Sequence, residues 1–96
     1  MITSKQRAIL RSHANQLDTI VHIGKNGINQ ALIDQVNEAL DSHELVKIKA
    51  LETSLLSAKE AAAELAQAVK CDVVQVVGGR LVLFRPNKEK PYSQYI

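Results

Sequence analysis

A short loop with glycine at both ends, Gly24-Lys25-Asn26-Gly27, has residue types that suit phosphate binding. Glycine lets the backbone turn without a Cβ clash and lets another backbone approach closely. The residues from Asn29 onward have a helical pattern, and the first amides of a helix lack internal partners and favour an anion. Lys25 adds a positive charge, and Asn26 can donate and accept hydrogen bonds. The loop therefore predicts a phosphate contact, although a simple turn would also explain the two glycines.

Other motifs for phosphates and nucleotides are missing from the sequence. It has neither the Gly-x-x-x-x-Gly-Lys-Ser/Thr pattern of a P-loop nor the Gly-x-Gly-x-x-Gly pattern of a dinucleotide site. One Phe and two Tyr are too few for the aromatic platform of an RRM sheet. KH domains clamp nucleic-acid backbone with a Gly-x-x-Gly loop. We therefore expect contact with a nucleic-acid backbone and not base stacking.

Basic residues are unevenly distributed along the chain. The net charge is only +2, from 12 basic and 10 acidic residues, yet the first 29 residues hold four basic residues and one acidic residue, Asp18. A local basic face on a nearly neutral protein indicates nucleic acid, with an ordinary solvated surface as the alternative. The same alternative applies to Lys47 and Lys49, which alternate outward on a predicted strand. His22 precedes the loop and could contact a phosphate. The candidate RNA-binding residues are Lys5, Arg7, Arg11, His22, Gly24, Lys25, Asn26, Gly27, Lys47 and Lys49.

Residues for catalysis or metal binding do not form a recognisable pattern. His13, His22, His43 and Cys71 have no metal-ligand spacing. His13 falls on an apolar helical stripe, so we expect it to be packed inside. No order of Ser, Cys, His and Asp suggests an activated nucleophile. We expect no enzyme activity, no metal and no cofactor.

The elements that would position the loop follow from periodicity and capping residues. Helices are predicted over residues 3–15, 29–42 and 57–70, and strands over 19–23, 44–51, 73–77 and 80–85. Thr3 with Gln6, or Ser4 alone, can cap the first helix, Asn29 the second, and Ser57 with Glu60 the third. The order helix, strand, helix, strand, helix, strand, strand predicts a mixed sheet with one face covered by helices and the other more open.

The last two strands are separated by Gly78-Gly79, a pair typical of a tight hairpin. A two-residue turn would place Asp72 opposite Arg85 as a structural ion pair. It would also divide the apolar side chains between the two faces of the sheet. One face would carry Val73, Val77, Val82 and Phe84, and the other would carry Val74, Val76, Leu81 and Leu83. The second face would then be apolar at this end, and either the tail covers it, which we favour, or it is a partner-binding patch.

Length and composition bound the organisation. The 96 residues fit one domain, expected over residues 1–90, with an irregular tail over 91–96. The single cysteine excludes an intrachain disulfide, and no apolar run approaches the ~20 residues of a membrane span. We expect a soluble, cytoplasmic monomer that does not bind membranes.

Several blocks in this order resemble the CRM domain family, and especially its bacterial stand-alone YhbY-like members. They are Ile23-Gly24-Lys25-Asn26-Gly27-Ile28-Asn29, His43-Glu44-Leu45-Val46-Lys47-Ile48-Lys49, Val74-Gln75-Val76-Val77-Gly78 and Leu81-Val82-Leu83-Phe84-Arg85-Pro86. The resemblance covers about residues 2–90. It implies an α/β fold, a two-layer sandwich whose four-stranded mixed sheet is backed by helices, related to the C-terminal domain of translation initiation factor three.

The same resemblance implies RNA binding and, in bacteria, association with pre-50S particles, the precursors of the large ribosomal subunit. Its loop positions correspond here to Gly24, Lys25, Asn26 and Gly27. Two alternatives stay open: a general RNA-binding protein not tied to the ribosome, and a protein–protein interaction module that uses the open sheet face.

Overall fold

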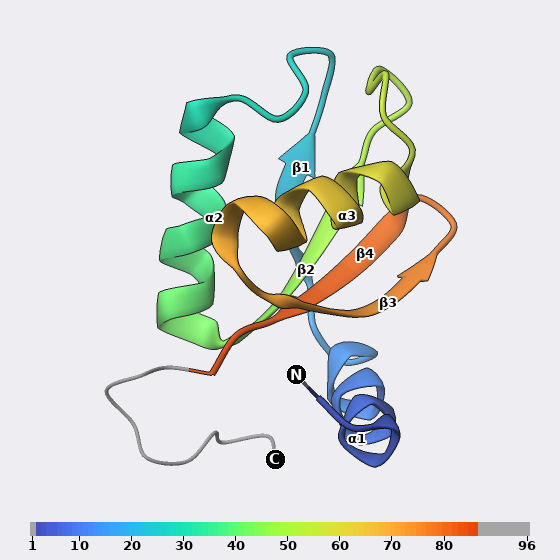
Figure 1. The fold of residues 1–96 in the computed structure, drawn as a ribbon. Helices are drawn as coiled ribbons and strands as arrows, with labels where there is room; N and C mark the ends of the chain where they lie inside the picture. Colours follow the sequence, from blue (N-terminus) through green and yellow to red (C-terminus); the bar gives the residue numbers. More distant parts are fainter. Residues whose placement is uncertain (1, 87–96) are drawn as a thin grey trace.

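The computed structural model describes residues 2–86, and it contains the helices and strands that the sequence predicts, each within one residue at either end (Figure 1). Residues 87–96, which include the predicted tail, lie outside the described part. In chain order the elements are α1 (Ser4–Ala14), β1 (Thr19–Ile23), α2 (Gln30–His43), β2 (Leu45–Ala50), α3 (Ala58–Val69), β3 (Asp72–Val77) and β4 (Arg80–Phe84).

Each helix begins where the sequence predicts a cap. The Gln6 amide donates to the Thr3 hydroxyl, and the Thr3 amide donates back to the Gln6 side chain. The same reciprocal pair joins Ser57 and Glu60 at the start of α3. These contacts satisfy amides that the helix itself leaves unpaired, and losing such a cap costs a helix about 1 kcal/mol. The predicted capping boxes are confirmed.

The four strands form one mixed sheet in the order β1-β2-β4-β3. β1 and β2 are parallel and are joined through α2, while β4 runs antiparallel to both β2 and β3. β1 is therefore an edge strand, and its carboxyl end leads directly into the Gly24–Gly27 segment (Figure 1). The predicted fold class, α/β with a four-stranded mixed sheet and helices, is confirmed.

Two separate apolar clusters hold the helices to the sheet. The larger lies between the sheet and helices α2 and α3, with buried Val36 and Leu40 from α2 and Ala61 and Leu65 from α3. The small alanine side chains let α3 approach the strands closely. The smaller cluster, on the other sheet face, contains Leu10, Ala14, Leu45, Val74, Val82 and Phe84. α1 thus covers part of the second face.

This position of α1 changes the prediction for the second face. We favoured the tail as the cover for its apolar side chains, and the tail lies outside the described residues. Within the described residues, the cover comes from Leu10 and Ala14 of α1. His13, predicted to be packed inside, is exposed, and so is Ile9 on the same helix. The prediction for His13 is wrong because α1 contacts the sheet along a narrow line of side chains spaced four residues apart.

The register of the β3–β4 hairpin matches the prediction only near its turn. Val77 pairs with Arg80 and Val76 with Leu81, but the register shifts between Val73 and Gln75. Asp72 consequently lies opposite Phe84, so the predicted pairing of Asp72 with Arg85 is wrong. The cause is an irregularity at Val74, which behaves as the extra residue of a β-bulge.

The bulge also exchanges faces within β3. Val74 joins Val82 and Phe84 in the cluster under α1, whereas Val73 contacts the larger cluster with Leu81. The predicted division of these side chains between the faces therefore fails for Val73 and Val74, which precede Gln75, and holds for Val76. Val77, before the turn, is exposed.

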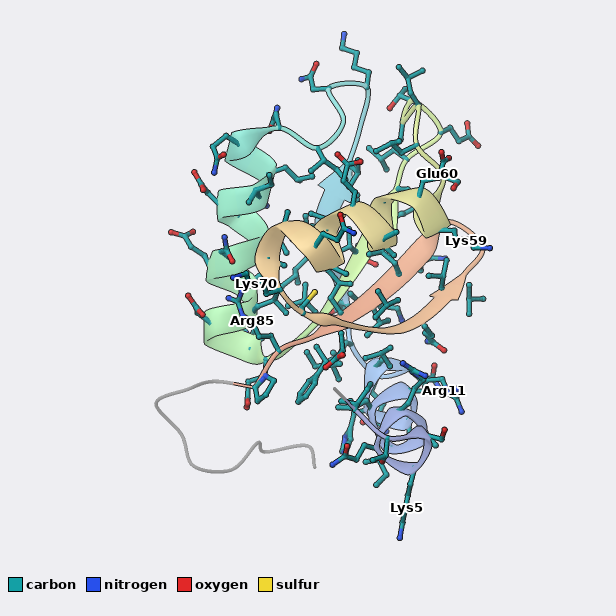
Figure 2. All side chains as sticks on the ribbon, viewed as in Figure 1. Lys5, Arg11, Lys59, Glu60, Lys70 and Arg85 are labelled. Atoms are coloured by element: carbon teal, nitrogen blue, oxygen red, sulfur yellow. The ribbon has the colours of Figure 1, made fainter. Side chains whose placement is uncertain are left out.

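Arg85 forms a structural contact of another kind. Its Nη1 donates to Asn37 Oδ1 at 2.8 Å and to the Val69 carbonyl at 2.7 Å. Its Nη2 donates to the Asn37 carbonyl at 3.2 Å and forms an ion pair with Asp41 at 2.9 Å. Figure 2 labels Arg85 beside α2. One guanidinium therefore links the residue after β4 to α2 and to the C-terminal end of α3.

None of the helices described between residues 2 and 86 is long and apolar enough to cross a membrane.

Candidate nucleic-acid interface

The Gly24–Gly27 segment, called the GxxG loop below, is a tight turn. The Gly27 amide donates to the Gly24 carbonyl at 3.0 Å, which leaves Lys25 and Asn26 at an exposed tip. Gly27 has a φ of +65°, in the left-handed region that favours glycine. Gly24 has no such requirement, because an added Cβ would lie 3.6 Å from Thr53 Oγ1, an ordinary contact. The turn geometry therefore depends on Gly27 and not on Gly24.

The start of α2 lies directly beyond this turn. Asn29 caps the helix, its side chain accepting from the Leu32 amide at 2.9 Å, and its carbonyl accepts from Ile33. The amides of Gln30 and Ala31 precede the first helical hydrogen bond and have no acceptor within the helix. No acidic residue lies in this first turn. The nearest carboxylate of α2, that of Asp34, lies one turn further along and accepts from the Gln30 side chain at 2.9 Å, so the first turn itself holds no negative charge.

A second loop, residues 51–56, lies beside the GxxG loop. The Leu51 amide donates to the Ile23 carbonyl at 2.8 Å, which ties the end of β2 to the end of β1. Between the loops and α2 is a groove of about 560 Å³. Its lining contains one lysine, one histidine and no carboxylate: His22, Gly24, Lys25, Asn26, Gly27, Asn29, Ala31, Leu32, Gln35 and Thr53. Thr53 and Gln35 were not predicted.

His22 and Lys49 are neighbours across the β1–β2 pair. His22 lies between Val21 and Ile23, which are buried in the larger cluster, so its side chain belongs to the opposite face. Lys49 follows Ile48 and lies on that same opposite face. Of these two predicted residues, His22 lines the groove beside the GxxG loop, and Lys49 is its neighbour on the next strand.

Lys47 has a structural contact that the sequence did not predict. Its Nζ donates to the carbonyls of Ala14 at 3.2 Å and Leu17 at 3.4 Å, just past the end of α1. A cation at these carbonyls suits the negative end of the α1 dipole, and it is a second donor to the Ala14 carbonyl, which also accepts from the Leu17 amide at 3.0 Å. Lys47 is half-buried there and fastens α1 to the sheet. Whether it also contacts RNA stays a prediction.

The basic residues of α1 lie far from the GxxG loop. Figure 1 shows α1 and the loop at opposite ends of the molecule, and Figure 2 shows Lys5 and Arg11 on α1 directed outward. Lys5 and Arg11 are exposed and Arg7 is half-buried. The predicted residues thus form two separate groups, one around the loop and one on α1.

Other reactive groups offer little chemistry. Among residues 2–86, no three His, Cys, Asp or Glu side chains are grouped so that they could hold a metal ion. Burial raises the pKa of the Cys71 thiol to about 11, although the positive charge of Arg85 lowers it in part. A thiol with that pKa is protonated at neutral pH, so Cys71 is a poor nucleophile there.

Comparison with known proteins identifies close relatives over almost the whole chain. The Bacillus subtilis protein named "Probable RNA-binding protein YqeI" is 36% identical over 89 residues, which cover 93% of each chain. A Haemophilus influenzae protein named "RNA-binding protein" is 30% identical over 88 residues, 92% of this chain and 89% of the relative. The solution structure of the hypothetical protein SAV1595 from Staphylococcus aureus has a TM-score of 0.78 and 40% identity, covering 92% of each chain.

The match to a family profile extends over the same region. The profile described as the CRS1 / YhbY (CRM) domain matches residues 2–85, which include every helix and strand described above. The blocks that carried the resemblance in the sequence all lie in this range or end one residue beyond it. On the profile match and on the identity to full-length relatives, the chain belongs to the CRS1/YhbY (CRM) domain family.

Proposed function

We propose that this chain is an RNA-binding protein that holds backbone phosphates at the GxxG loop and serves in assembly of the large ribosomal subunit. The observation that carries the proposal is the loop itself. It presents Lys25 and Asn26 at an exposed tip, directly before a helix start that has no acidic residue in its first turn. The groove beside it has no carboxylate in its lining.

The chemistry of this end of the molecule suits an oxyanion and not a base. Backbone amides of Gln30 and Ala31, the Lys25 ammonium and the Asn26 amide are donors that a phosphate oxygen accepts. Contacts of this kind fix the position of an RNA strand but carry no sequence information. A net charge of only +2 makes bulk electrostatics weak, so affinity has to come from this local arrangement.

The comparisons support the choice of ligand. Relatives that match over almost the whole chain carry names that describe them as RNA-binding. The finer proposal, pre-50S particles as the site of action, follows from the resemblance to bacterial stand-alone members of the family. The protein–protein alternative loses part of its support because α1 covers apolar side chains on the second sheet face.

The loop is tested by two matched pairs of substitutions. Gly24→Asp with Gly27→Asp places two carboxylates where phosphate is expected, and Gly24→Asn with Gly27→Asn adds nearly the same volume without charge. Both residue types tolerate the left-handed conformation of position 27 better than other side chains do. In a gel-shift assay with a structured rRNA fragment, the Asp pair should bind far more weakly than the Asn pair. Equal binding by the folded Asp pair and the unchanged protein would remove the loop from the site.

The ribosomal role is tested in cell extract. At low salt the protein should sediment in a sucrose gradient with incomplete large subunits, and high salt should release it because phosphate contacts weaken with salt. It should be scarce on polysomes, where ribosomal proteins cover the same RNA. A protein that stays at the top of the gradient, or that is equally abundant on translating ribosomes, would leave only general RNA binding.

A further inference from the structure

Three basic residues from three different strands lie in one row across the sheet. His22 of β1 is the register partner of Lys49 of β2, and Lys49 is the partner of Arg80 of β4. Neighbouring strands are about 4.8 Å apart, so the row spans roughly 10 Å. Sequence reasoning placed His22 and Lys49 among the candidates but not Arg80, because the pairing of β2 with β4 is a tertiary contact.

The three side chains belong to the same face. Ile48 and Leu81, which are adjacent to Lys49 and Arg80, are buried in the larger cluster with α2 and α3. Side chains alternate between faces along a strand, so the row lies on the opposite face, the one that carries α1. His22 and Arg80 are exposed and Lys49 is half-buried. The row is therefore open to a ligand on the side away from α2 and α3.

The row also lies between the two basic groups described above. At one end, His22 lines the groove beside the GxxG loop. Two residues before Lys49 on β2, Lys47 contacts the end of α1, a spacing of about 7 Å along the strand. Basic side chains thus continue from the GxxG loop across the sheet face toward α1, which carries Lys5, Arg7 and Arg11.

The exposed groups of this row are basic, and the aromatic side chain on this face is buried. Acidic side chains near this face include those of Asp72, which pairs with Phe84 at the far end of the sheet from Arg80, and Asp18, which lines a pocket with Leu45 and Lys47. Phe84, the one Phe, Tyr or Trp side chain within residues 2–86, is 1% exposed, so the exposed groups of this face that could stack on a base are the His22 imidazole and the Arg80 guanidinium. Such a surface has basic groups for phosphates but no platform of Phe, Tyr or Trp side chains for the unstacked bases that single-stranded RNA presents.

We propose that the row formed by His22, Lys49 and Arg80, called the sheet row, is a second phosphate-binding position, and that its ligand is the backbone of double-helical RNA. This inference rests on the proposed function, since it extends the RNA path from the GxxG loop. A duplex presents its phosphates at fixed spacing to a rigid sheet and keeps its bases stacked. The loop and the sheet row together then hold successive parts of one helical backbone.

The test compares two pairs of charge-removing substitutions on opposite faces. Lys49→Gln with Arg80→Gln removes two charges from the sheet row. Lys59→Gln with Lys70→Gln removes two exposed charges from α3 and its C-cap, on the other side of the sheet (Figure 2). Lys49→Arg with Arg80→Lys keeps both charges in place. Binding to an RNA hairpin of about 20 base pairs is followed by fluorescence anisotropy over a range of salt concentrations, with circular dichroism to verify folding.

The sheet-row pair should lower the slope of log affinity against log salt by about one for each lost contact. Each phosphate contact changes the logarithm of the affinity by about 0.9 for each tenfold change in salt concentration. If a contact contributes nothing at 1 M salt, its loss should therefore lower the affinity at 0.1 M salt about eightfold. The α3 pair should change the slope little, and the charge-keeping pair should bind like the unchanged protein. The hairpin should also bind more tightly than a single strand of the same length.

The outcomes separate the two proposals. If the sheet-row pair and the α3 pair bind equally while the Asp pair in the GxxG loop binds weakly, the sheet row is not a contact and the loop proposal stands. If a single strand binds as tightly as the hairpin, the assignment to double-helical RNA is overturned. If the unchanged protein binds neither RNA, both proposals fail.

Discussion

Replacement of Arg85 by methionine should destabilise the fold without touching the proposed RNA site. The guanidinium makes three half-buried hydrogen bonds, to Asn37 Oδ1 and to the carbonyls of Asn37 and Val69, at 2.7–3.2 Å. Hydrogen bonds from a charged donor contribute about 1.5–3 kcal/mol each, but bonds that share one donor group are not additive. The ion pair with Asp41 adds at most about 1 kcal/mol, because the Asp41 side chain is 75% exposed. We expect a loss of about 3 kcal/mol.

That loss is a large share of the 5–15 kcal/mol typical of a whole domain. Urea unfolding followed by circular dichroism should show it as a fall in midpoint of roughly 2 M, at an m-value of about 1.5 kcal/mol/M. Arg85→Lys keeps the charge but loses the planar fork, so its effect should be intermediate. Asp41→Asn should cost less than about 1 kcal/mol. A cost below 1 kcal/mol for Arg85→Met, or an equal cost for Asp41→Asn, would refute the assignment of stability to the buried hydrogen bonds.

Three further predictions concern other parts of the chain. Gly27→Ala should lower the melting temperature because φ there is +65°, at a cost of about 1 kcal/mol, whereas Gly24→Ala should be tolerated; equal effects would contradict the turn geometry. Lys47→Met should lower the free energy of unfolding by about 1–2 kcal/mol and speed amide exchange in α1, and unchanged exchange would argue against its role at the end of that helix. Because burial raises the pKa of Cys71 from 9.0 to about 11, the thiol should react much more slowly with a thiol reagent at pH 8 in the folded protein than in urea. The contribution of the Cys71 thiol to the free energy of unfolding is fully present below pH 9 and is lost as pH rises toward 11. Cys71→Ala should remove this pH dependence of stability.

Local features of the fold were predictable from the sequence because their causes are local. The capping pairs of α1 and α3 lie three residues apart, and the side-chain alternation of β2 depends on its own residues. Val46 and Ile48 indeed enter the larger cluster while Leu45 enters the smaller one. The resemblance to the CRM family then supplied the arrangement of these elements, which periodicity alone leaves open.

The features that the sequence did not predict depend on contacts between distant segments. The bulge at Val74 depends on how β3 fits against β4 and the two clusters, and nothing in a run of valines indicates it. Arg85 binds groups 16 and 48 residues away, so no local pattern names Asn37 or Val69 as its partners. Arg80 joins the sheet row only because β2 pairs with β4. The candidate site was therefore predictable around the loop and incomplete on the sheet.

The central claim, RNA bound at the GxxG loop, is tested most directly by following the backbone amide resonances of the labelled protein during titration with an RNA hairpin. We predict that the largest shifts occur at Lys25, Asn26 and Gly27 and in the first turn of α2, and that these shifts reverse when salt is added. Shifts that cluster on α3, or the absence of shifts at the loop while the RNA is bound, would contradict the account.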